Sequence, residues 1–125
     1  MPSPVRKKYY GSVTIFWLDK EALLRSVQRA VVTLVQSRCE VKLVKLFGSF
    51  AKGTATAASD VDIMIIVKDS RLRLLDRPIA YLPYFSDIGM PVELFVYTQN
   101  EIETNPSSIA EVALNRGITL WPAHA

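Results

Sequence analysis

The amino-acid sequence predicts a single domain of the α/β (α+β) class, with a mixed β-sheet flanked by helices. Three observations in the 125 residues lead to this class. Segments typical of strands alternate with segments typical of helices along the chain. Residues 60–67 (DVDIMIIV) are almost continuously apolar, as in a strand that is buried on both faces. Residues 23–35 place apolar side chains at three- and four-residue spacing, which is typical of a helix packed on a sheet.

The first three expected elements are a strand, a long helix and a second strand. Ser12–Trp17 is β-branched and aromatic and favours a short strand. Asp19 is a suitable N-cap for the helix, which we expect to end near Arg38. Val41–Phe47 alternates in polarity, which indicates a strand.

Capping and turn residues divide the remainder of the chain. Thr98 and Glu101 have the spacing of a capping box, which predicts the start of a short helix. The other expected elements, in order, are a helical turn closed by Gly53, a strand over residues 60–67, a partly helical segment over Arg71–Gly89 interrupted by Pro78 and Pro83, a strand over 91–98, the short helix over 99–104, a last helix from Ser107 or Ser108 through Asn115, and a closing strand over 118–121.

Bulk properties limit the classes of protein. We expect residues 1–18 to form an N-terminal extension with a short strand, and residues 19–125 to form the domain. No apolar run reaches the roughly 20 residues that a membrane span needs, so we expect a cytoplasmic protein that does not engage a membrane. A single cysteine, Cys39, and a single histidine, His124 near the chain end, argue against a zinc site and against a nucleophile–histidine pair. The net charge of +3 alone favours a solvated surface over nucleic-acid binding.

Carboxylates at the start of the apolar strand are the first candidate site. Side chains alternate along a strand, so Asp60 and Asp62 point to the same face. Their oxygens suit magnesium or manganese, and Glu93 in a later strand is the candidate third ligand. Asp69 and Asp87 are weaker candidates because both lie in expected loops or helix ends. Taken alone, the D-x-D pattern favours an ordinary structural role, in which Asp60 caps or ends a strand and Glu93 faces water.

A glycine-serine turn lies upstream of these acids. Gly48 would let a phosphate approach the backbone closely, because it has no Cβ. Ser49 could donate its hydroxyl to a phosphate oxygen at the start of a helical turn, and Lys52 could add positive charge nearby. An ordinary strand-to-helix turn with a serine N-cap is the alternative.

The combined pattern is much more specific than its parts. Gly48-Ser49, then ten residues, then Asp60-x-Asp62, then an acid in the next strand, resembles the minimal nucleotidyltransferases of the DNA polymerase β-like superfamily. The matching stretches are LFGSFAKGTATAASDVDIMIIV and PVELFVYT, within a resemblance that spans about residues 19–121. The resemblance implies the nucleotidyltransferase fold. It also implies transfer of a nucleoside monophosphate from a triphosphate, assisted by two magnesium ions, with manganese as a possible substitute.

The resemblance also implies a role for each site residue. Gly48 and Ser49 would hold the β- and γ-phosphates, and Asp60 and Asp62 would ligate both metal ions. Glu93 takes the place of the third carboxylate, which binds the catalytic metal and helps to deprotonate the acceptor hydroxyl. The family usually has aspartate at this third position, whereas this chain has glutamate.

Members of this group are often paired with a helical partner protein of the HEPN type, and some attach AMP to that partner as antitoxins. The resemblance therefore implies ATP, or another nucleoside triphosphate, as donor and a protein hydroxyl as acceptor. It also implies a HEPN-type partner, self-association, or both. Residues 77–89, aromatic and broken by prolines, are the nominated contact surface, with ordinary core packing as the alternative. Other functions left open are an aminoglycoside-type nucleotidyltransferase and a partner-binding subunit with a vestigial site.

Overall fold

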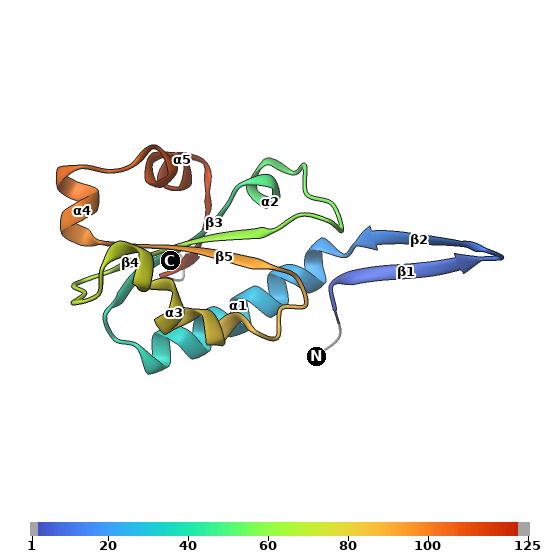
Figure 1. Ribbon diagram of the computed structural model, residues 1–125, viewed down its shortest axis with the longest axis horizontal. Helices are drawn as coiled ribbons and strands as arrows, with labels where there is room; N and C mark the ends of the chain where they lie inside the picture. The colour runs from blue at the N-terminus through green and yellow to red at the C-terminus, as the bar shows by residue number, and fades with distance from the viewer. Residues whose placement is uncertain (1–2, 123–125) are drawn as a thin grey trace.

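A computed structural model describes residues 3–122 of the chain; His124 lies outside these residues. The body is built on a four-stranded mixed sheet with strand order β5-β4-β3-β6, and a separate two-stranded hairpin projects from it (Figure 1). The elements are β1 (Val5–Tyr10), β2 (Val13–Leu18), α1 (Lys20–Ser37), β3 (Val41–Phe47), α2 (Ser49–Lys52), β4 (Val61–Val67), η1 (Leu74–Asp76), α3 (Pro78–Tyr81), η2 (Leu82–Phe85), β5 (Val92–Thr98), α4 (Gln99–Thr104), α5 (Ser108–Arg116) and β6 (Ile118–Trp121).

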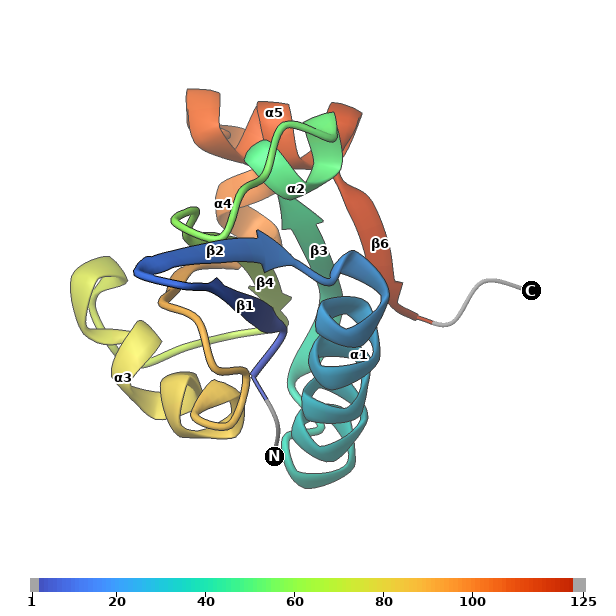
Figure 2. The same ribbon diagram turned by 90° about the vertical axis from the view of Figure 1, so that its right-hand side faces the viewer.

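The sheet mixes parallel and antiparallel pairs. β4 pairs with β5 in parallel, whereas β3 pairs antiparallel with both β4 and β6. Figure 2 shows the sheet between two layers, with α1 and α3 on one side and α2, α4 and α5 on the other. The predicted α/β class with a mixed sheet is therefore confirmed.

Each face of the sheet has its own apolar core, because side chains alternate along the strands. The larger core packs α1 and the segment from α3 to residue 88 against one face, with Val44 and Ile63 at its centre. The smaller core packs α5 against the other face, where Phe47 and Met64 lie. The acidic residues of β4 and β5 lie at the margin of this smaller core, since Asp62 shares the face of Met64.

The capping predictions are confirmed in atomic detail. The Asp19 carboxylate accepts a hydrogen bond from the Ala22 amide at 3.0 Å at the start of α1. Thr98 and Glu101 form the reciprocal bonds of a capping box at the start of α4. Local sequence signals therefore place these helix starts correctly.

The N-terminal extension differs from the prediction. The expected strand over Ser12–Trp17 is present as β2, but β1 precedes it and pairs with it antiparallel over its full length. Tyr9 and Phe16 lie on one face of this hairpin with Lys7 across from Phe16, and all are exposed. The charged run of β1 hides the strand from a search for apolar alternation.

The nominated contact surface, residues 77–89, is divided between the core and the surface. Tyr81, Phe85 and Ile88 are buried against α1 and the sheet, so the core-packing alternative holds for these three residues. Ile79 and Leu82 of the same segment remain exposed. Pro78 starts α3 rather than interrupting a helix, because its missing amide is not needed in a first turn. Among residues 3–122, no helix combines the length and apolarity of a membrane span.

Candidate active site

Three neighbouring strands start or stop at the same end of the sheet. β3 ends at Phe47, β4 begins at Val61, and β5 begins at Val92. Phe47 is the register partner of Asp62 on β3, and Glu93 is its register partner on β5. Register partners on neighbouring strands point to the same face, so the carboxylates of Asp62 and Glu93 lie side by side. Tertiary pairing thus joins two acids that are 31 positions apart in the sequence.

Asp60, Asp62 and Glu93 form a cluster of negative charge. Burial, followed by the charges of Glu93 and Asp60, raises the pKa of Asp62 above its usual range. Asp62 is half-buried, whereas Asp60 and Glu93 are exposed. Within residues 3–122, the Asp62 carboxylate has neither an ion pair nor a hydrogen bond. A bound cation would offset the repulsion that this arrangement creates.

The glycine-serine turn lies directly against this cluster. Gly48 has a φ of +75°, which favours glycine, and a Cβ at this position would overlap the Asp62 carboxylate oxygen. Ser49 is the first residue of α2, and its hydroxyl makes no hydrogen bond to any described residue. Lys52 is exposed in the last turn of α2. The turn and the carboxylates therefore form one continuous surface, because Gly48 has no side chain to separate them.

The side chains of this cluster fit a hard divalent cation, but they do not form a closed cage. Within residues 3–122, no three acidic, cysteine or histidine side chains are arranged to hold one metal ion. Magnesium often takes only one or two protein carboxylates and completes its shell with water and substrate phosphates. Asp60 and Asp62 could supply such ligands beside the turn, and the uncompensated charge around Asp62 favours a cation there.

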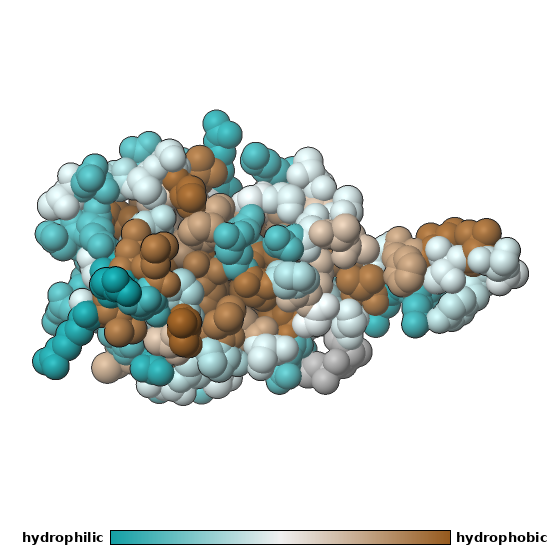
Figure 3. Space-filling view, viewed as in Figure 1, coloured by the Kyte–Doolittle hydropathy of each residue, from teal (hydrophilic) through white to brown (hydrophobic). Residues whose placement is uncertain are grey.

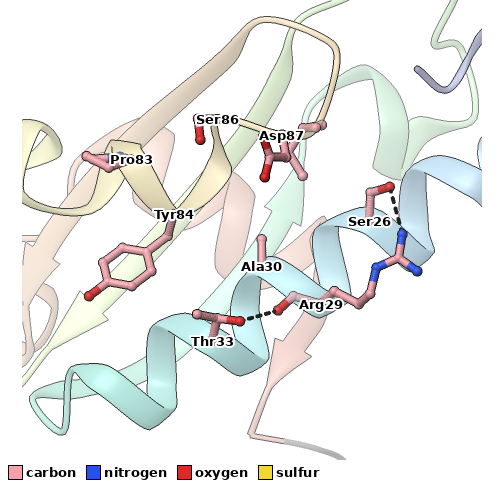
Figure 4. A pocket seen from close by; sticks show the side chains of 9 residues that line it. Ser26, Arg29, Ala30, Thr33, Pro83, Tyr84, Ser86 and Asp87 are labelled. Atoms are coloured by element: carbon pink, nitrogen blue, oxygen red, sulfur yellow. Dashed lines mark hydrogen bonds between the residues drawn. The ribbon is translucent and has the colours of Figure 1, made fainter. Parts of the chain in front are cut away.

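The weaker candidates lie elsewhere. Asp69 follows the far end of β4 and is exposed. Asp87 lines a cavity of about 310 Å³ between α1 and the segment after α3, with Ser26, Thr33 and Tyr84 (Figure 4). Neither acid belongs to the cluster around Asp62, so neither is a candidate third ligand.

Sequence reasoning missed a cavity next to the cluster. This cavity has a volume of about 320 Å³ and is lined by Glu93 and by apolar residues from η1, α3, β5 and α5. The elements that line this cavity are far apart in the sequence, so no short sequence motif predicts the cavity. Only the exposed leucines of residues 72–75 offered a signal, because a solvated turn rarely holds three leucines.

Comparisons with known proteins agree with this arrangement. The family model for the nucleotidyltransferase domain matches residues 24–119. A Methanocaldococcus jannaschii protein named "Putative protein adenylyltransferase" is 28% identical over 72 residues, covering 57% of this chain and 72% of that protein. A crystal structure of "a putative nucleotidyltransferase" from Sulfolobus solfataricus is similar, with a TM-score of 0.62, 20% identity and 82% coverage of both chains.

A toxin-antitoxin crystal structure with AMP-PNP also has the same fold. Its matching chain has a TM-score of 0.58 and 22% identity, over 75% of this chain and 72% of that one. A mutant of the toxin-antitoxin MntA-HpeT gives a TM-score of 0.57 and 20% identity, over the same shares of the two chains. At these identities, the solved structures establish a common fold.

Proposed function

This chain belongs to the nucleotidyltransferase domain family and is a nucleotidyltransferase. From this premise we propose that it transfers AMP from ATP to a hydroxyl group of a partner protein. The observation that carries the proposal is the contact surface between the Gly48 turn and Asp62. A triphosphate held at the turn would have its phosphates beside the carboxylates, where a bound cation would neutralise negative charge.

Each site residue has a chemical task in this proposal. The backbone of Gly48 and the hydroxyl of Ser49 hold the phosphates, and Lys52 adds positive charge at the edge of the turn. Asp60 and Asp62 would hold the divalent metal, and Glu93 would become a third ligand only by moving its exposed side chain toward them, because the three carboxylates are not arranged around one ion in the structure. When bound, magnesium supplies charge neutralisation on the phosphates and acidifies the acceptor hydroxyl. Glu93 takes the hydroxyl proton, directly or through water.

The transfer is a single displacement at the α-phosphorus. The acceptor oxygen forms a bond to this phosphorus, and the bond to the bridging oxygen of the β-phosphate breaks. Pyrophosphate leaves with the bonding electrons. The products are the AMP ester of the acceptor, pyrophosphate and one proton.

The relatives support ATP as donor and a protein as acceptor. One relative carries the name of a protein adenylyltransferase, and one structural neighbour is a toxin-antitoxin structure with AMP-PNP. We extend these properties to this chain, with a HEPN-type helical protein as the expected partner and self-association as a second mode. The alternative is a subunit that binds its partner without modifying it. The glutamate at position 93, where the family usually has aspartate, favours this alternative.

Labelled ATP distinguishes the two functions. The chain is incubated with α-labelled ATP, magnesium and the protein encoded next to it, and label on that protein is measured with and without EDTA. Magnesium-dependent label on the partner supports transfer. A stable complex without label, together with ATP binding that Asp60→Asn does not change, supports the passive subunit.

A further inference from the structure

The β1-β2 hairpin has no task in the proposed function. It precedes the part of the chain that matches the family model, which begins at residue 24. It projects from one end of the body along the long axis of the molecule (Figure 1). Among residues 3–122, its two strands pair only with each other. A two-stranded hairpin is only marginally stable in water, so a further strand would stabilise this one.

The outer edge of β2 is apolar and open to solvent. Val13, Ile15, Phe16 and Trp17 are each between 46% and 59% exposed, which shows that neither face of the strand is covered. Figure 3 shows apolar side chains along one side of the projecting hairpin and hydrophilic ones along the other. β2 has no charge, no proline and no register shift against β1. These are the features that usually protect an exposed strand edge from pairing.

The backbone of β2 has unpaired groups on this edge. At the base of the hairpin, the Asp19 amide donates to the Pro4 carbonyl at 2.8 Å. Hydrogen-bonded pairs alternate with non-bonded pairs along an antiparallel ladder, so the odd-numbered residues of β2 direct their backbone to β1. The backbone groups of Thr14 and Phe16 point outward and have no partner among residues 3–122.

The outer edge of β1 has the opposite character. β1 carries Arg6, Lys7 and Lys8 in succession, and the hairpin over residues 5–18 contains no acid. Two β1 strands that paired antiparallel would bring these like charges opposite one another, which destabilises a strand pair. The charges therefore discourage pairing of β1 with a second β1, whereas nothing in β2 discourages pairing with a second β2.

We propose that two copies of this chain pair through the outer edges of β2, antiparallel about a two-fold axis, and form one continuous sheet in the order β1-β2-β2-β1. This inference rests on the proposed function only for the expectation of self-association, to which it adds a surface and a symmetry. A two-fold interface uses the same patch on both copies, so assembly stops at the dimer.

The pairing with the longest overlap is centred on Ile15. It aligns residues 12–18 of both copies, and the outward-facing Thr14 and Phe16 exchange backbone hydrogen bonds with their counterparts. Ile15 meets its own copy as a non-hydrogen-bonded pair, with about 4.5 Å between the Cα atoms. On the same face, Val13 packs against Trp17 of the partner subunit. Every side-chain pair across the axis is uncharged.

The basic residues of β1 and the two bodies permit this arrangement. Lys8 is the register partner of Ile15 in each hairpin, so the two Lys8 residues are three strand spacings apart. This separation is roughly 14 Å. It exceeds the Debye length, which is about 8 Å at physiological ionic strength, so their repulsion is largely screened. Antiparallel pairing of the projecting hairpins places the two bodies at opposite ends of the joined sheet (Figure 1).

The dissociation constant of the full chain, measured by sedimentation, tests the interface. Ile15→Lys should raise it roughly 100-fold or more, because two like charges replace an apolar pair at the axis. Tyr10→Lys is the matched control. Tyr10 lies on the same face as Ile15 and is similarly exposed, at 54% against 49%, but belongs to β1. This control should change the dissociation constant about threefold at most.

A mixture of two variants shows whether Ile15 meets its own copy. Ile15→Glu alone should be as monomeric as Ile15→Lys alone. An equimolar mixture of the two should recover the dimer, because opposite charges then meet at the axis. Mixing cannot repair a hairpin that has unfolded, so recovery separates direct contact from a loss of folding. Absence of recovery would overturn the proposed interface.

Two further results would also overturn it: a wild-type chain that stays monomeric at millimolar concentration, and a dimer that Ile15→Lys leaves intact. A monomeric wild type that binds single-stranded oligouridylate, with an affinity that falls steeply as salt rises, would assign the hairpin to nucleic acid instead. None of these measurements uses AMP transfer. A failure of the transferase proposal in the labelled-ATP experiment is therefore distinguishable from a failure of this interface.

Discussion

Two carboxylate sites at opposite ends of β5 differ in whether a cation of the protein neutralises them. At the start of the strand, Glu93 lies beside Asp62, and no cation of residues 3–122 pairs with either. After its end, Glu101 accepts two hydrogen bonds from the Arg77 guanidinium, at 2.6 and 3.2 Å. The ion pair of Arg77 and Glu101 joins the start of α3 to α4, whereas the acids around Asp62 repel one another, and a bound cation would offset that repulsion.

The difference shows how charge at a strand end can be assigned a role. Arg77 also donates to the carbonyls of Leu72 and Val96, so its guanidinium makes four hydrogen bonds inside the fold. Asp62 has no such partner, since the charged groups near it are the acids Glu93 and Asp60. Substitutions at the two sites should therefore affect different measurements.

The largest expected effect is on activity at the uncompensated site. Asp62→Asn should lower AMP transfer roughly 1,000-fold or more, because about 4 kcal/mol of transition-state stabilisation depends on the metal that this carboxylate would hold. The midpoint of urea unfolding should stay the same or rise, because one repelling charge is gone. A transfer rate equal to wild type would contradict the assignment, and Asp69→Asn at the far end of β4 is the matched control.

Gly48→Ala should also act on this site. A Cβ would overlap the Asp62 carboxylate, and the φ of +75° is strained for alanine. We expect a loss of roughly 100-fold in transfer and about 1 kcal/mol in stability. Gly53→Ala is the control for backbone strain alone, since Gly53 has a similar φ of +78° with open space around its Cα. Equal transfer rates in the two variants would show that contact with Asp62 is unimportant.

The compensated site should respond in stability. Arg77→Met should lower the free energy of unfolding by about 2–3 kcal/mol, because it leaves the Val96 carbonyl without a donor and Glu101 without its cation. Glu101→Gln should cost only about 1 kcal/mol, since glutamine still fits the capping box. Urea unfolding measures both. Equal costs would mean that the ion pair, and not the buried guanidinium, dominates.

The smallest expected effect is a pH dependence of opposite sign at the two sites. Bonds from Arg77 hold the pKa of Glu101 below its ordinary 4.5, so its contribution is complete above pH 4.5 and is lost as pH falls through the lower folded value. The raised pKa of Asp62 works in reverse: its penalty is absent below the ordinary 3.8 and grows as pH rises through the higher folded value.

Urea unfolding at several pH values tests these signs. The stability advantage of wild type over Glu101→Gln should shrink on acidification. The advantage of Asp62→Asn over wild type should shrink as well, because protonated Asp62 no longer carries the repelled charge. An advantage of Asp62→Asn that grows as pH falls would show that its charge is already compensated in the fold.

Much of the fold follows from local sequence. Asp19 and Thr98 fix two helix starts by capping, and residues 61–67 are too apolar for anything but a buried element. The secondary-structure and burial predictions failed where the local sequence pattern suggests one environment and tertiary packing creates another. β1 is charged yet pairs with β2, and Tyr81 looked like a surface aromatic yet fills the core against α1. Neither outcome has a signal within a few residues.

The sequence by itself determined the chemical groups: a glycine that can adopt φ of +75°, two aspartates on one side of a strand, and a later glutamate. Only the tertiary structure decided that Gly48 lies against Asp62 and that Glu93 is the register partner of Asp62. The physical reason is that register and strand order depend on which apolar faces pack together across the whole chain, and no short segment carries that information.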